Sequence, residues 1–336
     1  MRLSIKMYLI IFICASVILY QYHLSNAWLI SQTSTQDFRV LNAKASEKLK
    51  NVTAFFNASS SSNTNSTQTN RTTFVSDCFP PQEKETNLPP LYIITPTYRR
   101  PEQLAELTRL SHTLMLVKNV YWIVVEDAVR KSALVTDLLK KTGLKYEHLT
   151  APMPDQYKKK KKGPKPRGVS NRNKGIQWIR KNAKSGVLYF ADDDNTYDLQ
   201  LFDEIRYTKR VSMFPVGLIT KLGVSSPIVK NGIFSGFYDG WMAGRKFPVD
   251  MAGFAISVKF LLKRPKALMP FKPGFEEDGF LKSLEPFEPQ DIELLASNCT
   301  KILVWHTQTK KNEPSQALDF AKYNNTNLVM LKQILV

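Results

Sequence analysis

Residues 187–195 join a short apolar run directly to a cluster of carboxylates. Val187 to Ala191 is continuously apolar, which is typical of a strand buried in a parallel sheet. Asp192, Asp193 and Asp194 follow, and adjacent carboxylates repel one another and resist removal from water. The carboxyl end of a core strand is also where open α/β sheets bind ligands. The pattern therefore predicts either a solvated acidic turn or a site for a hard cation, such as Mn²⁺ or Mg²⁺, that bridges to substrate phosphates.

The chain before this run alternates between strand and helix patterns. Apolar residues predict strands at 91–95, 121–125 and 146–149, and helical spacing predicts helices after Pro101, at about 132–141 and at about 169–182. This order is typical of a parallel, Rossmann-like sheet with right-handed crossovers. No Gly-rich dinucleotide motif and no Walker sequence is present. We therefore expect a nucleotide site built from polar residues at strand ends.

The chain after the run has a different pattern. We expect a helix at 199–209, strands at 216–221, 227–229 and 233–238, a helix at 276–284 and a last strand at 299–305. Asn231-Gly232 is a strong signal for a tight turn that joins two antiparallel strands. The second half is therefore predicted to be rich in antiparallel pairing and to pack on the first.

The N-terminal region predicts targeting to the secretory pathway. Arg2 and Lys6 precede an apolar run at 7–20, which places the N-terminus in the cytosol. No small-residue cleavage site follows, so we favour an uncleaved signal anchor over a removed signal peptide. The next segment, to about residue 88, is rich in Ser, Thr and Asn and is interpreted as a flexible stem. Candidate N-glycosylation triplets begin at Asn51, Asn57, Asn65, Asn70, Asn298 and Asn324.

The charge and the cysteine content narrow the function further. The net charge of +18 comes in part from five consecutive lysines at 158–162, which predict a solvated loop that raises the potential near a nucleotide. The anchor and the glycosylation triplets disfavour nucleic-acid binding. Arg167 and Arg172 offer paired donors for a diphosphate or a carboxylate, although Arg172 is equally compatible with an exposed helix charge. Three cysteines are too few for a disulfide scaffold.

Six sequence blocks carry a specific resemblance, and they occur in order at 94–98, 122–128, 167–173, 189–195, 250–255 and 298–307. Together they resemble the animal β-1,3-glucuronosyltransferases of glycosyltransferase family 43 over about residues 89–310. The resemblance implies an α/β fold of the GT-A type, with a Rossmann-like donor half and a mixed-sheet acceptor half. It also implies a type II Golgi membrane enzyme that uses UDP-glucuronate and Mn²⁺, forms a homodimer, and acts on galactose-terminated glycans of proteoglycans or glycoproteins.

The resemblance also suggests boundaries for the parts of the chain. These are a cytosolic tail at 1–6, a signal-anchor helix at 7–22, a lumenal stem at 23–88, a UDP-sugar-binding subdomain at 89–195, an acceptor subdomain at 196–310 and a C-terminal tail at 311–336.

On the donor side, the resemblance assigns roles to eight residues. Tyr98 and Asp127 are implied to hold the uridine. The other implied contacts are Arg167 and Arg172 to the diphosphate or glucuronate, Asp192 and Asp193 to ribose and sugar, Asp194 to the metal, and His306 to the diphosphate.

On the acceptor side, an inverting transfer needs one base to take the proton of the acceptor hydroxyl. The resemblance implies Glu277 as this base, with Glu276 as the neighbouring alternative, and Asp250 as a hydrogen-bond partner of the acceptor galactose. From the residues alone, Glu277 is also compatible with an ordinary acidic helix start, which the helix dipole favours.

Three positions depart from the family pattern. Ser225 stands where an acceptor-contacting glutamate occurs, Lys272 is the only cation in the segment where an arginine is usual, and Gln308 replaces an arginine after the His-Thr pair. The donor residues match, whereas the acceptor side differs. The expected function is transfer of glucuronate to the 3-hydroxyl of a terminal β-galactose, and the alternative is a weakly active or inactive membrane-tethered glycan-binding paralogue.

Overall fold

The computed structural model describes residues 88–159, 163–242, 244–309, 311–313, 315–324 and 326–334. The expected cytosolic tail, signal anchor and most of the stem lie outside these residues, as do four glycosylation candidates, Asn51, Asn57, Asn65 and Asn70. Within the described residues, every helix is too short or too polar to cross a bilayer.

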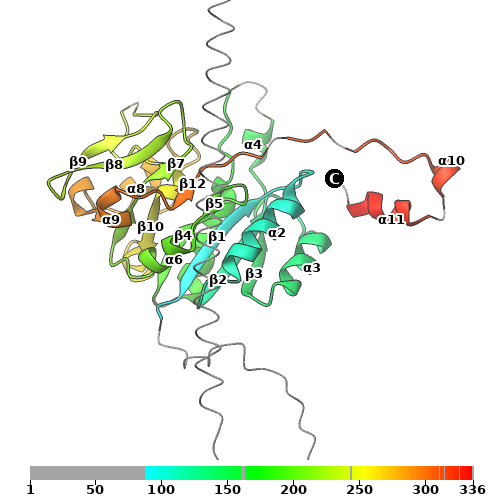
Figure 1. The fold of residues 1–336 in the computed structure, drawn as a ribbon, viewed down its shortest axis with the longest axis horizontal. Coiled ribbons are helices and arrows are strands. Elements are labelled where there is room, and N and C mark those ends of the chain that lie inside the picture. The colour runs from blue at the N-terminus through cyan, green and yellow to red at the C-terminus, as the bar shows by residue number, and fades with distance from the viewer. Residues whose placement is uncertain are drawn as a thin grey trace, which may run out of the picture. The chain divides into compact units, whose positions relative to one another are not determined.

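A seven-stranded sheet forms the centre of the described fold, in the order β11-β6-β10-β4-β1-β2-β3 (Figure 1). Four of its strands pair in parallel: β1 (Leu91–Thr97), β2 (Val120–Glu126), β3 (Lys145–Thr150) and β4 (Val187–Phe190). All four residues of β4 are buried, as its continuous apolar pattern predicts. Because β4 lies between β1 and β10, the acidic triplet follows a strand in the middle of the sheet.

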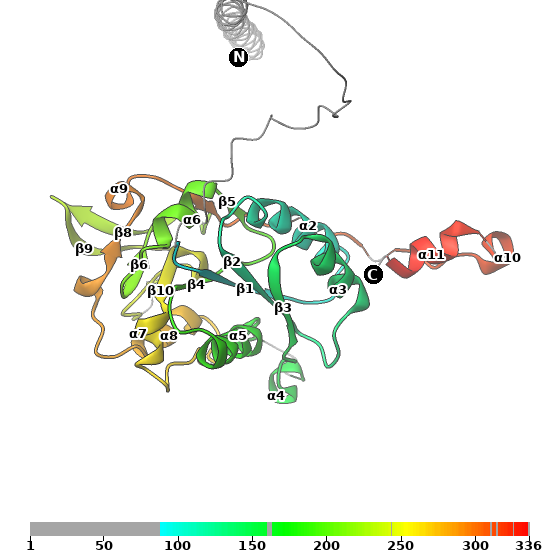
Figure 2. The same cartoon turned by 90° about the horizontal axis from the view of Figure 1, so that it is seen from below.

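Helices cover both faces of the parallel strands. In Figure 2, α2 (Gln103–Leu114) and α3 (Ala133–Lys141) lie on one side and α5 (Val169–Asn182) lies on the other. Leu107 of α2 joins the core cluster on the first side, and Ile176 of α5 joins the cluster on the second. Burying one such side chain stabilises the fold by about 1.5–3 kcal/mol. The predicted Rossmann-like half is therefore confirmed.

The second half of the chain extends the same sheet with mixed pairing. Strand β10 (Phe254–Ser257) is antiparallel to both β4 and β6 (Val211–Met213), and β11 (Glu293–Leu294) runs parallel to β6. Around these strands lie α6 (Leu199–Ile205), a 3₁₀ turn η1 (Met251–Gly253), α7 (Val258–Leu262), α8 (Glu276–Lys282) and a second 3₁₀ turn η2 (Pro289–Asp291).

A smaller five-stranded sheet has the order β5-β12-β7-β8-β9. Its strands are β5 (Thr196–Tyr197), β7 (Val216–Gly217), β8 (Val224–Lys230), β9 (Ile233–Tyr238) and β12 (Val304–Trp305). Asn231 and Gly232 join β8 to β9 with φ angles of 53° and 76°, which is the left-handed geometry of a tight hairpin turn. The expected turn and the antiparallel-rich second half are both confirmed.

Two expected strands are shorter than predicted, and the strand expected at 227–229 is longer, at Val224–Lys230. The strand expected at 299–305 is reduced to Val304–Trp305, because the chain before it makes a left-handed turn, labelled α9 (Ala296–Cys299). The Ala296 N–H donates to the Glu204 carboxylate at 2.6 Å, and the Cys299 N–H donates to the Leu295 carbonyl at 2.8 Å. The strand expected at 216–221 ends at Gly217, because Leu218 and Thr220 have positive φ angles that an extended strand excludes.

The remaining differences concern short elements. The helix expected at 199–209 ends at Ile205. A short helix, α4 (Asp155–Lys158), precedes the basic loop, and two helices follow residue 310, namely α10 (Phe320–Tyr323) and α11 (Asn327–Ile334). The sequence pattern did not predict these three helices or the strands β5, β6 and β11.

Candidate active site

The acidic triplet divides its charges among different partners. Asp193 is buried, and it accepts hydrogen bonds from the Thr97 hydroxyl and the Arg100 guanidinium, each at 2.7 Å. Asp192 forms an ion pair with Arg172, which projects from α5 and is also buried. The solvated acidic turn and the exposed helix arginine are therefore wrong descriptions of these residues.

Asp194 differs from its two neighbours. Its backbone carbonyl accepts a hydrogen bond from the Thr307 hydroxyl at 2.6 Å, but no described residue bonds to its carboxylate. Burial raises the pKa of Asp194, and the charges of Asp192 and Asp193 raise it further. Unpaired negative charge therefore remains at this end of β4.

This arrangement fits a hard cation that has one protein carboxylate as its ligand. No group of three or more His, Cys, Asp or Glu side chains among the described residues is placed to hold a metal ion. A Mg²⁺ or Mn²⁺ ion commonly takes one or two carboxylates, with substrate phosphates and water completing its shell. Asp194 can supply such a carboxylate, since Asp192 and Asp193 are already paired with arginines.

Three further expected residues, His306, Asp250 and Glu277, are linked by a contact and by charge. The His306 Nδ1 atom lies 3.7 Å from the Asp250 carboxylate, although the resemblance assigns them to opposite substrates. Asp250 precedes η1, and its side chain accepts a hydrogen bond from the Ala252 N–H at 3.0 Å. The charge of Asp250 also acts on Glu277, the second residue of α8. Asp250 therefore acts electrostatically on both the imidazole and the expected base.

The carboxyl of Glu277 is poised to exchange a proton near neutral pH. Its burial among protein atoms raises the pKa of Glu277 to about 7, and the charges of Asp250 and Glu276 raise it, while Arg245 opposes them. A base works best when its pKa lies near the working pH. Glu277 also lies in the first turn of α8, so the description as an acidic helix-start residue stays open beside the role of a base. It stays a prediction that Glu277, and not Glu276, takes the proton.

The three other expected donor residues are more exposed or less constrained. Tyr98 is 42% exposed, and the Arg100 guanidinium lies 4.6 Å from its ring centre. Asp127 follows β2, and its side chain accepts a hydrogen bond from the Met153 N–H at 2.7 Å. Arg167 is exposed at the end of the basic loop. All three follow or approach the carboxyl ends of parallel strands, but the structure does not bring them into contact with the triplet.

Two cations and one aromatic residue of this region were missed by the sequence analysis. Arg100 follows β1 and pairs with Asp193, as the Arg-Arg pair directly after a strand could have suggested. Arg245 donates to the Gly274 carbonyl just before α8, and its guanidinium carbon lies 5.3 Å from the ring centre of Trp241. Trp241 is 61% exposed. No sequence pattern links these two residues to a turn thirty positions away.

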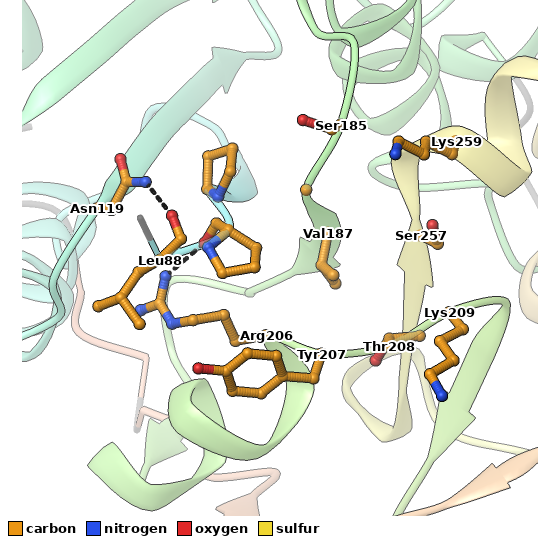
Figure 3. A pocket seen from close by; sticks show the side chains of 13 residues that line it. Leu88, Asn119, Ser185, Val187, Arg206, Tyr207, Thr208, Lys209, Ser257 and Lys259 are labelled. Carbon is orange, nitrogen blue, oxygen red and sulfur yellow. Dashed lines mark hydrogen bonds between the residues drawn. The ribbon is translucent and has the colours of Figure 1, made fainter. Parts of the chain in front are cut away.

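A cavity of about 750 Å³ lies at the opposite edge of the central sheet (Figure 3). Its lining comes from the starts of β1, β2 and β4, from the link between α6 and β6, and from the junction of β10 with α7. It contains none of the expected site residues. Buried Arg206 donates to the carbonyls of Pro89 and Lys118 at 2.7 and 2.6 Å, and Asn119 donates to the Leu88 carbonyl at 2.6 Å. These bonds tie the start of β1 to neighbouring segments, so this edge is structural.

The fold and the site together define an α/β protein with a cluster of carboxylates after a central strand of its sheet and a carboxyl of raised pKa on α8. Comparison with known proteins identifies its family. The family model described as glycosyltransferase family 43 matches residues 110–310, and the chain belongs to this family. The GT-A type fold expected from the resemblance is the one observed.

Curated relatives extend this match. The chain is 60% identical over 266 residues to "Galactosylgalactosylxylosylprotein 3-beta-glucuronosyltransferase P" of Drosophila melanogaster, covering 79% of this chain and 54% of the relative. It is 49% identical over 244 residues to "Galactosylgalactosylxylosylprotein 3-beta-glucuronosyltransferase S" of the same organism, covering 72% and 59%. Against "Galactosylgalactosylxylosylprotein 3-beta-glucuronosyltransferase 2" of Mus musculus, the identity is 46% over 252 residues, covering 71% and 76%. The chain thus spans little more than half the length of the two fly proteins.

Proposed function

We propose that this chain is an inverting glucuronosyltransferase that moves glucuronate from UDP-glucuronate to the 3-hydroxyl of a terminal β-galactose. The observation that carries the proposal is Glu277, whose pKa burial raises to about 7 and on which the charge of Asp250, a neighbour of His306 at 3.7 Å, also acts. Family membership and the printed names of the relatives support the choice of donor and acceptor.

On the acceptor side, Glu277 acts as the base and Asp250 orients the sugar. The ionised Glu277 takes the proton from the 3-hydroxyl while the hydroxyl oxygen attacks the anomeric carbon of glucuronate. The bond from that carbon to the UDP oxygen breaks on the opposite side, so the configuration inverts. Asp250 is held by the Ala252 N–H and faces His306, which fixes its carboxylate for a hydrogen bond to the galactose.

On the donor side, the chain supplies charges that match a nucleoside diphosphate. Tyr98 and Asp127 contact the uridine, and Asp193, locked by Thr97 and Arg100, contacts the ribose. Further contacts come from Asp192 to the sugar and from Arg167, Arg172 and His306 to the diphosphate or the glucuronate carboxylate. Cationic and hydrogen-bond donors of this kind stabilise charge that develops on a leaving diphosphate.

Asp194 is proposed to hold Mn²⁺ together with the diphosphate. When bound, the ion neutralises charge on the departing UDP. The support for this assignment is the unpaired and partly buried Asp194 carboxylate beside two carboxylates that are already paired.

We further propose that the chain works in the Golgi as a single-pass type II membrane protein with a lumenal catalytic domain, and that it forms a homodimer. The basic residues before the apolar run at 7–20 and the triplets at Asn51, Asn57, Asn65 and Asn70 support the orientation. Asn298 is exposed in α9, where a lumenal location would make it accessible to glycosylation, and Asn324 follows α10.

A transfer assay on the full chain in detergent tests the proposal. The donor is UDP-glucuronate, with UDP-glucose as control, and the acceptors are Gal-Gal-Xyl and N-acetyllactosamine, each with Mn²⁺ or with EDTA. We expect glucuronate transfer to at least one acceptor, only with Mn²⁺. Binding of UDP and Mn²⁺ without transfer to either acceptor would instead identify a glycan-binding paralogue. One structural feature favours that second candidate: Ser225 is fully buried and its hydroxyl accepts from the Asp250 N–H at 3.3 Å, so it offers no acceptor contact.

A further inference from the structure

A buried acid and a buried histidine form a pair that the proposed chemistry does not use. Glu126 is the last residue of β2, and His148 lies in β3. The two residues are 2% and 3% exposed. The His148 Nε2 atom lies 2.7 Å from Glu126 Oε2. Neither residue belongs to the acidic triplet or to the acceptor side. Burying an ionisable pair costs free energy unless each partner makes its full set of hydrogen bonds. The other hydrogen bonds of Glu126 and His148 therefore show which segments the pair holds in place.

The hydrogen-bond pattern assigns the protons of this pair. The Thr136 hydroxyl lies 2.9 Å from the Ser132 carbonyl and 3.0 Å from His148 Nδ1. Its single proton goes to the carbonyl, which can only accept, so Nδ1 of His148 donates to the hydroxyl. Burial raises the pKa of Glu126, but the hydrogen bonds from His148 and from the Ser132 N–H outweigh this and lower it. The His148 Nε2 atom faces the Glu126 carboxylate, so the imidazole is held between the Thr136 hydroxyl and Glu126.

Two chains of hydrogen bonds lead from Glu126 to the donor side. The Ser132 N–H donates to Glu126 Oε2 at 2.8 Å, which closes the loop 127–132 that begins with Asp127. On the other side, the Gln103 amide nitrogen lies 3.4 Å from Glu126 Oε1 and 3.3 Å from the Thr97 hydroxyl oxygen.

The second chain continues into the acidic triplet. The Gln103 amide has two protons and can donate one to Glu126 and one to Thr97. The Thr97 hydroxyl then has its own proton to give, and it donates to Asp193 Oδ2 at 2.7 Å. Gln103 and Thr97 are both buried. The direction of every hydrogen bond along this chain is therefore fixed by the charge on Glu126.

We propose that Glu126 is a positioning residue for the nucleoside, with His148 as its hydrogen-bond partner and Gln103 as the link to Asp193. This inference rests on the proposed function, because it takes Asp127 and Asp193 as the residues that hold uridine and ribose. The Glu126 carboxylate then fixes the position of both ends of the nucleoside subsite. It holds the loop that begins at Asp127 by its bond with Ser132, and it holds the Asp193 side chain by way of Gln103 and Thr97. A ligand that depends on two carboxylates loses affinity when either one is misplaced.

The variant Gln103→Leu tests the link because it has about the same size and leaves the Glu126–His148 pair and Asp193 unchanged. The matched control is Thr95→Val, which removes the acceptor of the buried Trp122 Nε1–H bond of 2.9 Å in the same strand but outside the chain of hydrogen bonds. Calorimetry on the full chain would measure UDP binding with Mn²⁺ and uridine binding without metal, and thermal unfolding would be followed for each variant.

We expect Gln103→Leu to weaken UDP binding and uridine binding by the same factor, about tenfold, because the lost contacts are to the nucleoside that both ligands share. A tenfold change in affinity corresponds to about 1.4 kcal/mol of binding free energy. Thr95→Val is expected to lower the unfolding temperature and to leave both affinities unchanged. Equal affinities in Gln103→Leu and in the native chain, or a loss of affinity for UDP alone, would overturn the positioning role. UDP binding by the native chain would in that case still support the donor site. Failure of the native chain to bind UDP would overturn the proposed function and this inference with it.

Discussion

The side chains of the site are best understood by how each charge is balanced. Arg100 and Arg172 neutralise Asp193 and Asp192, and both arginines come from the elements next to β4 in the sheet or on its face. The Asp194 carboxylate has no hydrogen-bond partner among the described residues, and burial raises the pKa of Glu277 to about 7. The three adjacent carboxylates thus differ in their charge partners because each one is surrounded by different side chains.

The raised pKa of Glu277 predicts the pH dependence of transfer. Only the ionised carboxylate can accept the hydroxyl proton, and its fraction grows as the pH rises through about 7. We expect kcat/KM to rise about tenfold per pH unit below this value and to level off above it. Glu277→Gln should abolish transfer and retain UDP binding.

The variant Glu276→Gln is the control for this assignment. The charge of Glu276 raises the pKa of Glu277, so its removal should move the inflection to lower pH while turnover persists. Loss of transfer in Glu276→Gln together with retained transfer in Glu277→Gln would make Glu276 the base.

The sequence predicted those site residues that follow directly from a strand end. Asp192 to Asp194 were found because an apolar run meets carboxylates without a spacer. Arg245 and Trp241 could not be found in this way, since they reach the turn before α8 from a loop beyond β9 and their contact depends on tertiary packing. In the structure, Arg245 supplies a cation near the segment where Lys272 is the only one in sequence.

Among the elements, α5 and β1 are joined by an unusually close contact. A Cβ atom at Gly175 of α5 would lie 2.7 Å from Ile94 Cδ1, closer than packed carbon atoms approach. The helix therefore rests directly on the strand, and this contact fixes the height of Arg172, one turn before Gly175, above the sheet. A glycine in mid-helix, which costs helix stability by itself, is explained by this packing.

We expect Gly175→Ala to destabilise the fold, by about 1–3 kcal/mol, because overpacking of the α5–β1 contact outweighs the better helix propensity of alanine. Chemical denaturation measures the free energy of unfolding. Lys174→Ala, at the exposed neighbouring position, is the matched control and should change it by less than about 0.5 kcal/mol. A Gly175→Ala protein as stable as the native chain would show that the helix shifts freely and that this contact does not set the position of Arg172.

The elements that the sequence predicted well share one physical property. The strands β1, β2 and β4 and the helices α2, α3 and α5 are long or strongly apolar, so their local pattern and their burial agree. The strands β5, β7, β11 and β12 are two residues long, and pairing with distant segments creates them. Likewise, the left-handed turn at 296–299 replaced part of an expected strand, and a tertiary hydrogen bond from the Ala296 N–H to Glu204 holds it.

At the scale of the whole molecule, a single sheet takes strands from both expected subdomains. Strands β6, β10 and β11 continue the sheet that β1 to β4 begin, and β10 lies directly beside β4. The η1 turn, which Asp250 precedes, leads straight into β10, so Asp250 and the acidic triplet are attached to neighbouring strands. Their relative position is therefore a property of the sheet and not of a flexible interface.

The net charge of +18 predicts a salt dependence that separates the two substrates. A strongly basic protein attracts an anionic donor from a distance, and this attraction is screened as the Debye length falls from about 10 Å at 0.1 M salt to about 3 Å at 1 M. We expect the KM for UDP-glucuronate to rise over this range, while the KM for an uncharged galactose-terminated acceptor changes little. The triple substitution Lys158→Gln, Lys159→Gln and Lys165→Gln should reduce the dependence of the donor KM on salt concentration. It should leave kcat unchanged, because these lysines lie outside the proposed site. Equal salt slopes for donor and acceptor would mean that the charge serves general solubility and does not guide the donor.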